Sequence, residues 1–193
     1  ASLTTQGPAV NMAMSITSAT NFYQLINGTS DPVPATKAGK ELSFIRTVSK
    51  QTQQYAGRIT TAAQKVTTQV TYPTGNSLAD QLKIVARLVK GGLKTRVYMV
   101  SYGSFDTHAS QTQTDTTTGS HANLLKNVSD AIKAFQDDLK FLNIEERVMG
   151  LTFSEFGRRV SQNASNGTDH GTANNMFFIS GGLKQKGVLN AMP

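Results

Sequence analysis

One long pattern constrains the fold more than any other feature of the sequence. An apolar run at residues 96–102 (RVYMVSY) precedes an amphipathic segment at residues 122–143, and a second apolar run follows at residues 147–153. The amphipathic segment repeats apolar side chains at the spacing of one helix face: Leu125, Val128, Ile132, Phe135, Leu139 and Leu142. A strand, a helix and a strand in this order predict a right-handed crossover between two parallel strands.

The rest of the chain extends this pattern. A third strand is predicted at residues 175–180, and two further helices are predicted at residues 40–70 and 78–89. Helices covering the faces of such a sheet predict an α/β fold, a three-layer sandwich with a mostly parallel sheet. We expect a single domain in which residues 76–193 form the core that carries the motifs. Residues 1–75 are then an extension with a strand and the long helix.

Composition excludes several classes of protein. The chain has 193 residues, and no apolar run approaches the ~20 residues of a transmembrane helix. Because it has no cysteine, it has neither disulfides nor thiolate metal sites. The net charge of +7 is compatible with polyanion binding, but the basic residues are scattered and no aromatic residues interleave them, so nucleic acid is not the expected partner. The chain begins without an initiator Met or a signal peptide, and we expect it to be a piece of a longer product.

Two of the three histidines lie within two residues of an aspartate in glycine-containing motifs. Asp106 and His108 follow the first apolar run in the sequence YGSFDTH, and Asp169 and His170 lie in GTDHG. Glycines on both sides of an Asp-His pair predict a tight turn that directs both side chains towards one point. A carboxylate beside an imidazole suits a divalent metal or a proton-transfer site.

These motifs are expected to meet at one edge of the predicted sheet. Ligands of open parallel sheets bind at the carboxyl ends of the strands, where Asp106, His108 and Glu155 would lie. The loop at residues 156–174 is too polar and glycine-rich for a crossover helix, so the third strand could return without crossing and keep the second motif at the same edge. The candidate metal ligands are Asp106, His108, Glu155, Asp169 and His170. Oxygen and nitrogen donors without sulfur favour Zn, Mn or Mg.

Each candidate also has a purely structural interpretation. The Asp-His pairs would equally suit hydrogen-bonded loop turns, and Glu155 would equally cap a helix that begins at Phe156. Arg158 is the candidate substrate-binding residue because a guanidinium can hold an anion with two hydrogen bonds, but it could also form a surface salt bridge. His121, just before the predicted third helix, is interpreted as a capping or solvent-exposed residue.

The motifs carry a resemblance to a known family. The segments SYGSFDTHASQ, LTFSEFGRRVSQNASNGTDHG and FFISGGLK resemble the bacterial family called domain of unknown function 1501. That family has the motifs G-G-F-D-T-H, S-E-F-G-R and G-T-D-H-G, followed by G-G. The resemblance covers residues 76–184, and Ser104 stands where the family usually has Gly.

This resemblance implies a fold, a location and an activity. Members look like exported proteins, often with a twin-arginine signal, which implies a periplasmic or secreted location. They are grouped with the alkaline phosphatase and sulfatase superfamily, which implies a partial alkaline-phosphatase-like core, two divalent metals and a Ser or Thr nucleophile. The chain departs from the superfamily pattern because only Thr107 separates Asp106 from His108, and Phe156 stands where a His ligand is expected. No nucleophile can be placed.

The prediction that follows is a metal-dependent hydrolase of phosphate or sulfate esters, with a small anionic ester as its substrate. The alternative is a non-catalytic exported module that keeps the fold as a binding scaffold.

Overall fold

The structure is a computed structural model that describes residues 2–6, 11–15 and 35–190. The chain divides into two compact units. Unit 1 comprises residues 1–68 and 87–100, and unit 2 comprises residues 69–86 and 101–193. Among the described residues, no helix is both long and apolar enough to cross a membrane.

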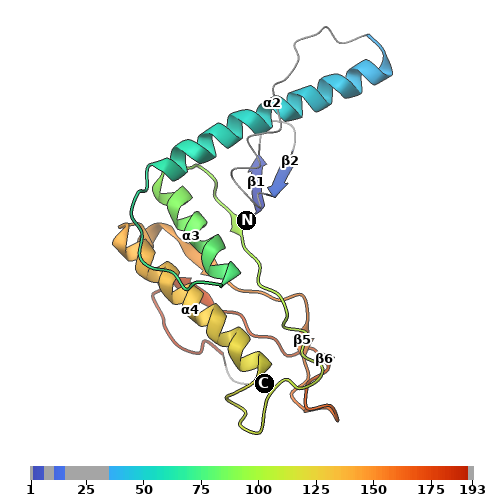
Figure 1. Ribbon diagram of the computed structural model, residues 1–193, viewed down its shortest axis with the longest axis vertical. Coiled ribbons are helices and arrows are strands. Elements are labelled where there is room, and N and C mark those ends of the chain that lie inside the picture. Colours follow the sequence, from blue (N-terminus) through green and yellow to red (C-terminus); the bar gives the residue numbers. More distant parts are fainter. Residues whose placement is uncertain (1, 7–10, 16–34, 191–193) are drawn as a thin grey trace. The chain divides into compact units, whose positions relative to one another are not determined.

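The elements of each unit can be followed in Figure 1. Unit 1 contains helix α2 and three short strands: α2 (Lys37–Gln64), β1 (Ser2–Gln6), β2 (Asn11–Ser15) and β3 (Tyr98–Met99). Helix α3 (Ser77–Lys90) begins in unit 2 and ends in unit 1. Unit 2 otherwise contains one long helix, one 3-10 turn and four short strands: α4 (Ser120–Phe141), η2 (Glu145–Arg147), β4 (Met149–Leu151), β5 (Gly157–Arg158), β6 (His170–Gly171) and β7 (Phe178–Ser180).

Unit 1 is built on α2, which begins at Thr36, where the threonine side chain accepts a hydrogen bond from the Gly39 amide. Ile59 and Ala62 on this helix pack against Leu88 at the end of α3. Gly91 then lies directly against the backbone of Ala62, so a Cβ at position 91 would overlap the Ala62 carbonyl. This close approach allows the segment after α3 to run along α2.

Substitution of Gly91 therefore tests the packing of unit 1. We expect Gly91→Ala to lower the free energy of unfolding by about 1–3 kcal/mol, because backbone must move to admit the methyl group. Gly57→Ala is the matched control: it lies within α2, a Cβ there meets nothing within 4 Å, and helix propensity predicts a gain of about 1 kcal/mol. Urea unfolding of both variants measures the difference. A stability loss at position 57 equal to that at position 91 would contradict the packing argument.

Unit 2 is organised around α4, which buries one stripe of its surface, namely Ala131, Ala134, Phe135, Asp138 and Leu139. Asn76 fixes the start of α3 beside it: its side-chain oxygen accepts from the amides of Leu78 and Ala79 at 3.1 and 3.2 Å. The side-chain nitrogen of Asn76 donates to the carbonyl of Asn127 on α4 at 2.7 Å. One buried amide thus both caps a helix and joins it to its neighbour.

The predicted three-layer α/β sandwich, with its mostly parallel sheet and partial alkaline-phosphatase-like core, is wrong. In the described part of the chain every strand pairing is antiparallel: the strand order in unit 1 is β2-β1-β3, and in unit 2 β4 pairs with β7 and β5 pairs with β6. The first apolar run pairs with the N-terminal segment, not with the second run, so no parallel partner exists for it there. The third run turns back beside the second because the connection at residues 159–177 contains no helix that could carry it over the sheet.

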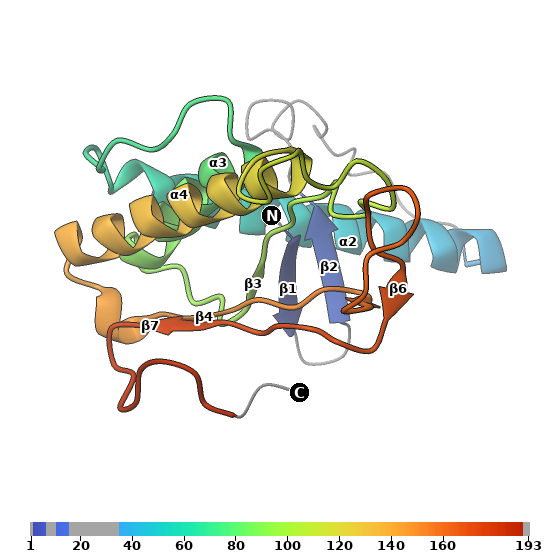
Figure 2. The ribbon, with the colours of Figure 1, turned by 90° about the horizontal axis from the view of Figure 1, so that it is seen from below.

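The β4–β7 ribbon also differs from a buried sheet in its exposure. Figure 2 shows the two strands side by side. In their register, Leu151 pairs with Phe178. Large apolar side chains on and beside these strands are exposed: Met149 by 69%, Leu151 by 48%, Phe153 by 69% and Phe178 by 46%. Continuous apolar runs are typical of strands covered on both faces. Here the sequence pattern is present, but no described element covers this face.

Candidate metal centre

Three of the predicted ligands lie together on the surface of unit 2. The side chains of Asp106, His108 and His170 each offer one ligand atom, and these atoms lie within 4.8 Å of one another. Asp106 Oδ1 is 2.9 Å from His108 Nε2 and 2.8 Å from His170 Nε2, and the two ring nitrogens are 3.2 Å apart. Residues more than sixty positions apart in the sequence therefore direct two imidazoles and one carboxylate at a common point.

The donor set has the chemistry and the spacing of a divalent metal site. Metal–ligand bonds of about 2.0–2.2 Å at right angles separate neighbouring ligand atoms by about 2.8–3.1 Å, whereas tetrahedral angles separate them by about 3.3–3.6 Å. The observed separations of 2.8 and 2.9 Å fall in the first set, and that of 3.2 Å lies midway between the two sets. Two imidazole nitrogens favour Mn or Zn over Mg, which prefers oxygen ligands. The residues present fit such an ion.

Asp169 occupies a different position from the other three. Its Oδ1 lies 3.4 Å from His108 Nδ1, the ring nitrogen that faces away from Asp106 and His170. A carboxylate on the second nitrogen of a ligand histidine sets its tautomer and ring orientation. The geometry therefore favours Asp169 as the residue that orients His108, whereas the sequence predicted it as a ligand.

A glycine allows the two motif loops to meet. A Cβ at Gly167 would overlap the carbonyl of His108, so only glycine admits this approach. The loops are then tied by backbone hydrogen bonds: the amide of Ser110 donates to the carbonyl of Ser165 at 3.0 Å, and that of Gln111 donates to Asn166 at 2.8 Å. The first glycine of G-T-D-H-G, Gly167, thus permits a close contact between the backbones of the two loops.

Asn163 is a site residue that the sequence did not reveal. Its side-chain nitrogen donates to the His108 carbonyl and to Asp169 Oδ1, both at 2.9 Å, while its oxygen accepts from the amides of Ser165 and Gly167. One amide therefore holds both loops and the carboxylate of Asp169. No spacing distinguished it from the other asparagines of this polar loop.

The guanidinium of Arg158 forms hydrogen bonds with other residues of the protein. It donates to the backbone carbonyls of Phe105 and Thr168, one from each motif loop, and Nη2 lies 3.2 Å from Asp106 Oδ1. Its side chain is only 17% exposed. These contacts favour a positioning role for Arg158, while its predicted contact with a substrate stays a prediction. Arg159 is exposed and forms no ion pair with a described carboxylate.

Hydrogen bonding keeps both aspartates of the motifs ionised to low pH. The hydrogen bond with His170 lowers the pKa of Asp106 below its ordinary value, and electrostatic interactions with His108, His170 and Arg158 lower it further. For Asp169, the hydrogen bond from Asn163 lowers the pKa most, followed by that with His108. Carboxylates that stay ionised are the form that binds a cation.

Glu155, the remaining predicted ligand, lies outside the cluster of Asp106, His108 and His170. It precedes Phe156, whose ring stacks on the imidazole of His170 with centroids 3.9 Å apart and an angle of 17°. The aromatic residue that breaks the superfamily pattern thus packs on a candidate ligand and fixes its ring plane. Glu155 as a metal ligand stays a prediction.

The third histidine, His121, lies outside the cluster of Asp106, His108 and His170. His121 lies in the first turn of α4, half-buried, with its ring edge-on to Phe105 at 6.1 Å. Burial lowers the pKa of His121, and the nearby charge of Arg158 lowers it further. Because the folded protein resists protonation of this ring, its contribution to stability is complete above the unfolded pKa of about 6.5 and is lost as the pH falls towards the lower folded value.

This gives a pH-dependent prediction. Between pH 7 and pH 5 (about the range of histidine titration), the free energy of unfolding is expected to fall more steeply for the wild-type protein than for His121→Gln. Urea unfolding at several pH values measures both slopes. Identical slopes would show that the ring is as easily protonated in the folded chain as in the unfolded one.

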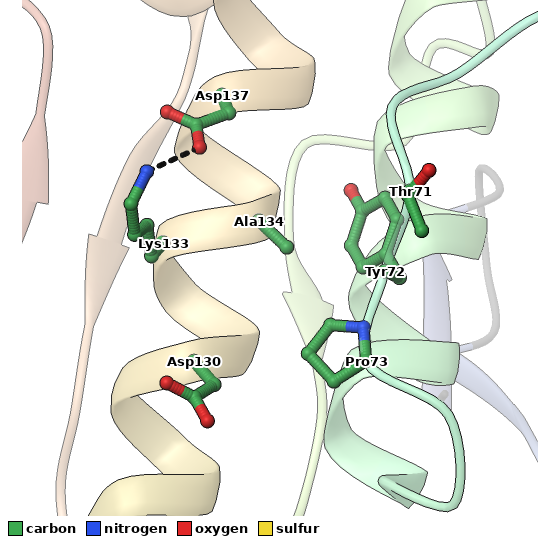
Figure 3. Close-up of a pocket in the computed structure, with 7 residues that line it drawn as sticks. All are labelled: Thr71, Tyr72, Pro73, Asp130, Lys133, Ala134 and Asp137. Carbon is green, nitrogen blue, oxygen red and sulfur yellow. Dashed lines mark hydrogen bonds and ion pairs between the residues drawn. The ribbon is translucent and has the colours of Figure 1, made fainter.

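A hollow on unit 2 shares no residue with the His and Asp cluster. It has a volume of about 320 Å³ and lies between α4 and the segment Thr71–Tyr72–Pro73. Figure 3 shows Lys133 paired with Asp137 on the helix side and the Tyr72 and Pro73 rings on the other. Both carboxylates that line it are paired, Asp137 with Lys133 and Asp130 with Lys126. The hollow therefore adds nothing to the chemistry of the candidate metal centre.

Comparison with known proteins identifies a family but no activity. A family model described as "Protein of unknown function (DUF1501)" matches residues 35–193, which include both motif loops. No curated protein and no solved structure matches the chain significantly. The case for a function therefore depends on the geometry of the cluster.

Proposed function

The chain belongs to the DUF1501 family of proteins of unknown function, and we propose that it is a metal-dependent hydrolase of phosphate or sulfate esters. The observation that carries the proposal is the convergence of Asp106 Oδ1, His108 Nε2 and His170 Nε2, which lie 2.8–3.2 Å apart and are exposed to solvent. Three protein ligands on a surface leave the remaining positions of an ion open to water and substrate, as catalytic sites require.

The residues around the cluster have distinct roles in this proposal. Asp106, His108 and His170 would hold Mn or Zn, and Asp169 would hold the His108 ring in place through its second nitrogen. A bound divalent ion supplies Lewis-acid polarisation of an ester oxygen and lowers the pKa of water. Arg159, exposed and adjacent to the Arg158 that braces Asp106, would offset the negative charge of a phosphate or sulfate group.

Turnover by the purified protein tests the proposal. Hydrolysis of p-nitrophenyl phosphate and p-nitrophenyl sulfate is measured with Mn, Zn or Mg after removal of bound metal by chelation. We expect activity with Mn or Zn on at least one ester, abolished in His170→Ala and retained in Glu155→Gln. Failure of every metal to support turnover of either ester would refute the hydrolase.

The alternative is a metal-holding module without catalysis. The contacts of Arg158 favour this alternative. Its guanidinium, which was predicted to bind the substrate, instead donates hydrogen bonds to backbone carbonyls of the two loops. Metal binding without turnover would support this alternative.

The family resemblance also supports a location, and we propose that the protein acts in the periplasm or outside the cell. Fractionation of cells that express the full gene product tests this, and its recovery in the cytoplasm would contradict it.

A further inference from the structure

A second candidate site lies in unit 1 and is a groove along the second half of α2. The groove has a volume of about 1200 Å³, and its other wall is the segment at residues 91–97. Four basic side chains line it, Arg58 on α2, Lys65 at the C-terminal cap of α2, and Lys94 and Arg96 on the facing segment. Among the described residues, no acidic side chain lines it. All four are exposed, and none forms an ion pair with a described carboxylate.

The groove lies in the unit that holds the chain's excess of basic over acidic residues. Unit 1 contains 10 Lys and Arg against 2 Asp and Glu, whereas unit 2 contains 9 against 10. The net charge of +7 thus arises from unit 1 and is not spread evenly over both units. Charges of one sign that line a concave surface raise the local concentration of ligands of the opposite sign.

The spacing of the basic residues favours a chain-like ligand over a single small anion. Arg58 and Lys65 are separated by two turns of α2, about 10 Å along the helix axis. Lys94 and Arg96 lie two positions apart in the facing segment, which leads into strand β3. Charges distributed in this way along both walls fit acidic groups that repeat along a polymer.

The uncharged lining distinguishes between polymers. Single-stranded nucleic acid is held by bases stacked on aromatic rings. Tyr55, the one aromatic residue among the described residues that line the groove, packs on the cluster of Ile59, Ala62 and Leu88, and its hydroxyl is hydrogen-bonded with Thr95 Oγ1. A recessed groove also suits a single chain better than the convex surface of a duplex. Gln54 and Thr61 instead offer partners for sugar hydroxyls.

We propose that the groove of unit 1 binds an acidic polysaccharide, a sugar chain that carries sulfate or carboxylate groups. This site is independent of the metal centre in unit 2.

Binding to defined oligosaccharides tests the proposal. The probes are a heparin octasaccharide for sulfate, an alginate oligomer for carboxylate, a dT oligonucleotide for nucleic acid and neutral dextran as a blank, each measured by calorimetry at several salt concentrations. The groove variant is Lys65→Gln with Lys94→Gln, one residue from each wall. The matched control is Lys37→Gln with Lys40→Gln, which removes the same charge from the start of α2, outside the groove.

The groove predicts that at least one acidic oligosaccharide binds, with an affinity that falls with salt and that exceeds the affinity for dT. The groove variant is expected to bind about tenfold more weakly, because it loses two charge contacts, whereas the control changes less than about twofold. Thermal unfolding confirms that both variants stay folded. Equal losses in the two variants, tighter binding of dT, or no binding of either acidic oligosaccharide would overturn the proposal.

Discussion

His170→Ala and His108→Ala are each expected to weaken the binding of Mn²⁺ or Zn²⁺ by about 100-fold or more, since loss of a ligand costs at least as much as loss of its supporting partner. Both side chains contribute Nε2 to the same point, 2.8 and 2.9 Å from Asp106 Oδ1. Removal of one leaves a single imidazole and one carboxylate, fewer than the three protein ligands with which catalytic sites hold an ion. Calorimetric titration of the metal-free protein measures the affinity without reference to activity.

Two further variants make this result specific. Asp169→Asn is expected to weaken binding by a smaller factor, about 10-fold, because it disturbs only the orientation of the His108 ring. Glu155→Gln is expected to leave the affinity unchanged, since Glu155 lies outside the cluster. If Glu155→Gln weakened binding as much as His170→Ala, the ligand set deduced from the cluster would be wrong.

The second large effect is expected at Asp138, where Asp138→Ala should lower the free energy of unfolding by about 3–5 kcal/mol. Asp138 is fully buried and accepts hydrogen bonds from Tyr72 Oη at 2.9 Å, Gln69 Nε2 at 2.7 Å and the Val70 amide at 3.2 Å. Alanine would leave the buried Tyr72 hydroxyl and the partly buried Val70 amide without their acceptor, while Gln69 Nε2 keeps its hydrogen bond to the Lys83 carbonyl. The segment that leads into α3 would then lose its attachment to α4.

Its neighbour Asp137 is a matched control one position away. Asp137 is exposed and pairs with Lys133 at 2.6 Å, an arrangement worth little in water. Asp137→Ala is therefore expected to change the unfolding free energy by at most about 0.5 kcal/mol. Chemical denaturation of both variants provides the comparison, and a small loss at Asp138 would mean that water replaces the missing acceptor.

Tyr72 offers a second readout of the same interaction. Burial raises the pKa of the Tyr72 phenol far above its ordinary value, and the hydrogen bond to Asp138 raises it further. The phenol thus stays protonated and continues to donate. Because the folded pKa lies above the unfolded one, this contribution is complete below about pH 10 and is lost as the pH rises beyond it.

Local patterns predicted the helices well but the sheet poorly. Apolar spacing located the helix expected at residues 122–143, which forms at Ser120–Phe141, and the one expected at residues 78–89, which forms at Ser77–Lys90. A helix is specified by neighbours three and four positions apart. Strand partners are specified by distant residues, and the run at residues 96–102 has β1 as its partner, which its own sequence does not encode.

Site residues that belong to sequence motifs could be predicted, whereas residues whose importance comes from tertiary contacts could not. Asp106, His108 and His170 stand beside Gly and Thr in recognisable motifs, and they lie together. The burial of Asp138 could have been predicted from the sequence, because it lies three positions after Phe135 and four before Leu142 on the apolar stripe of α4. Asn163 had no such signal, since its importance comes from His108 and Asp169, both brought to it by folding.

The contact of Gly167 with His108 ties the two motif loops together, so binding of the proposed cation is expected to order both loops at once. The amides of Ser110 and Gln111 bond across to the second loop and do not touch the proposed ion. Cation binding should therefore slow hydrogen exchange at these two amides together, and a mass-spectrometric exchange experiment would detect occupancy through backbone atoms that are not ligands.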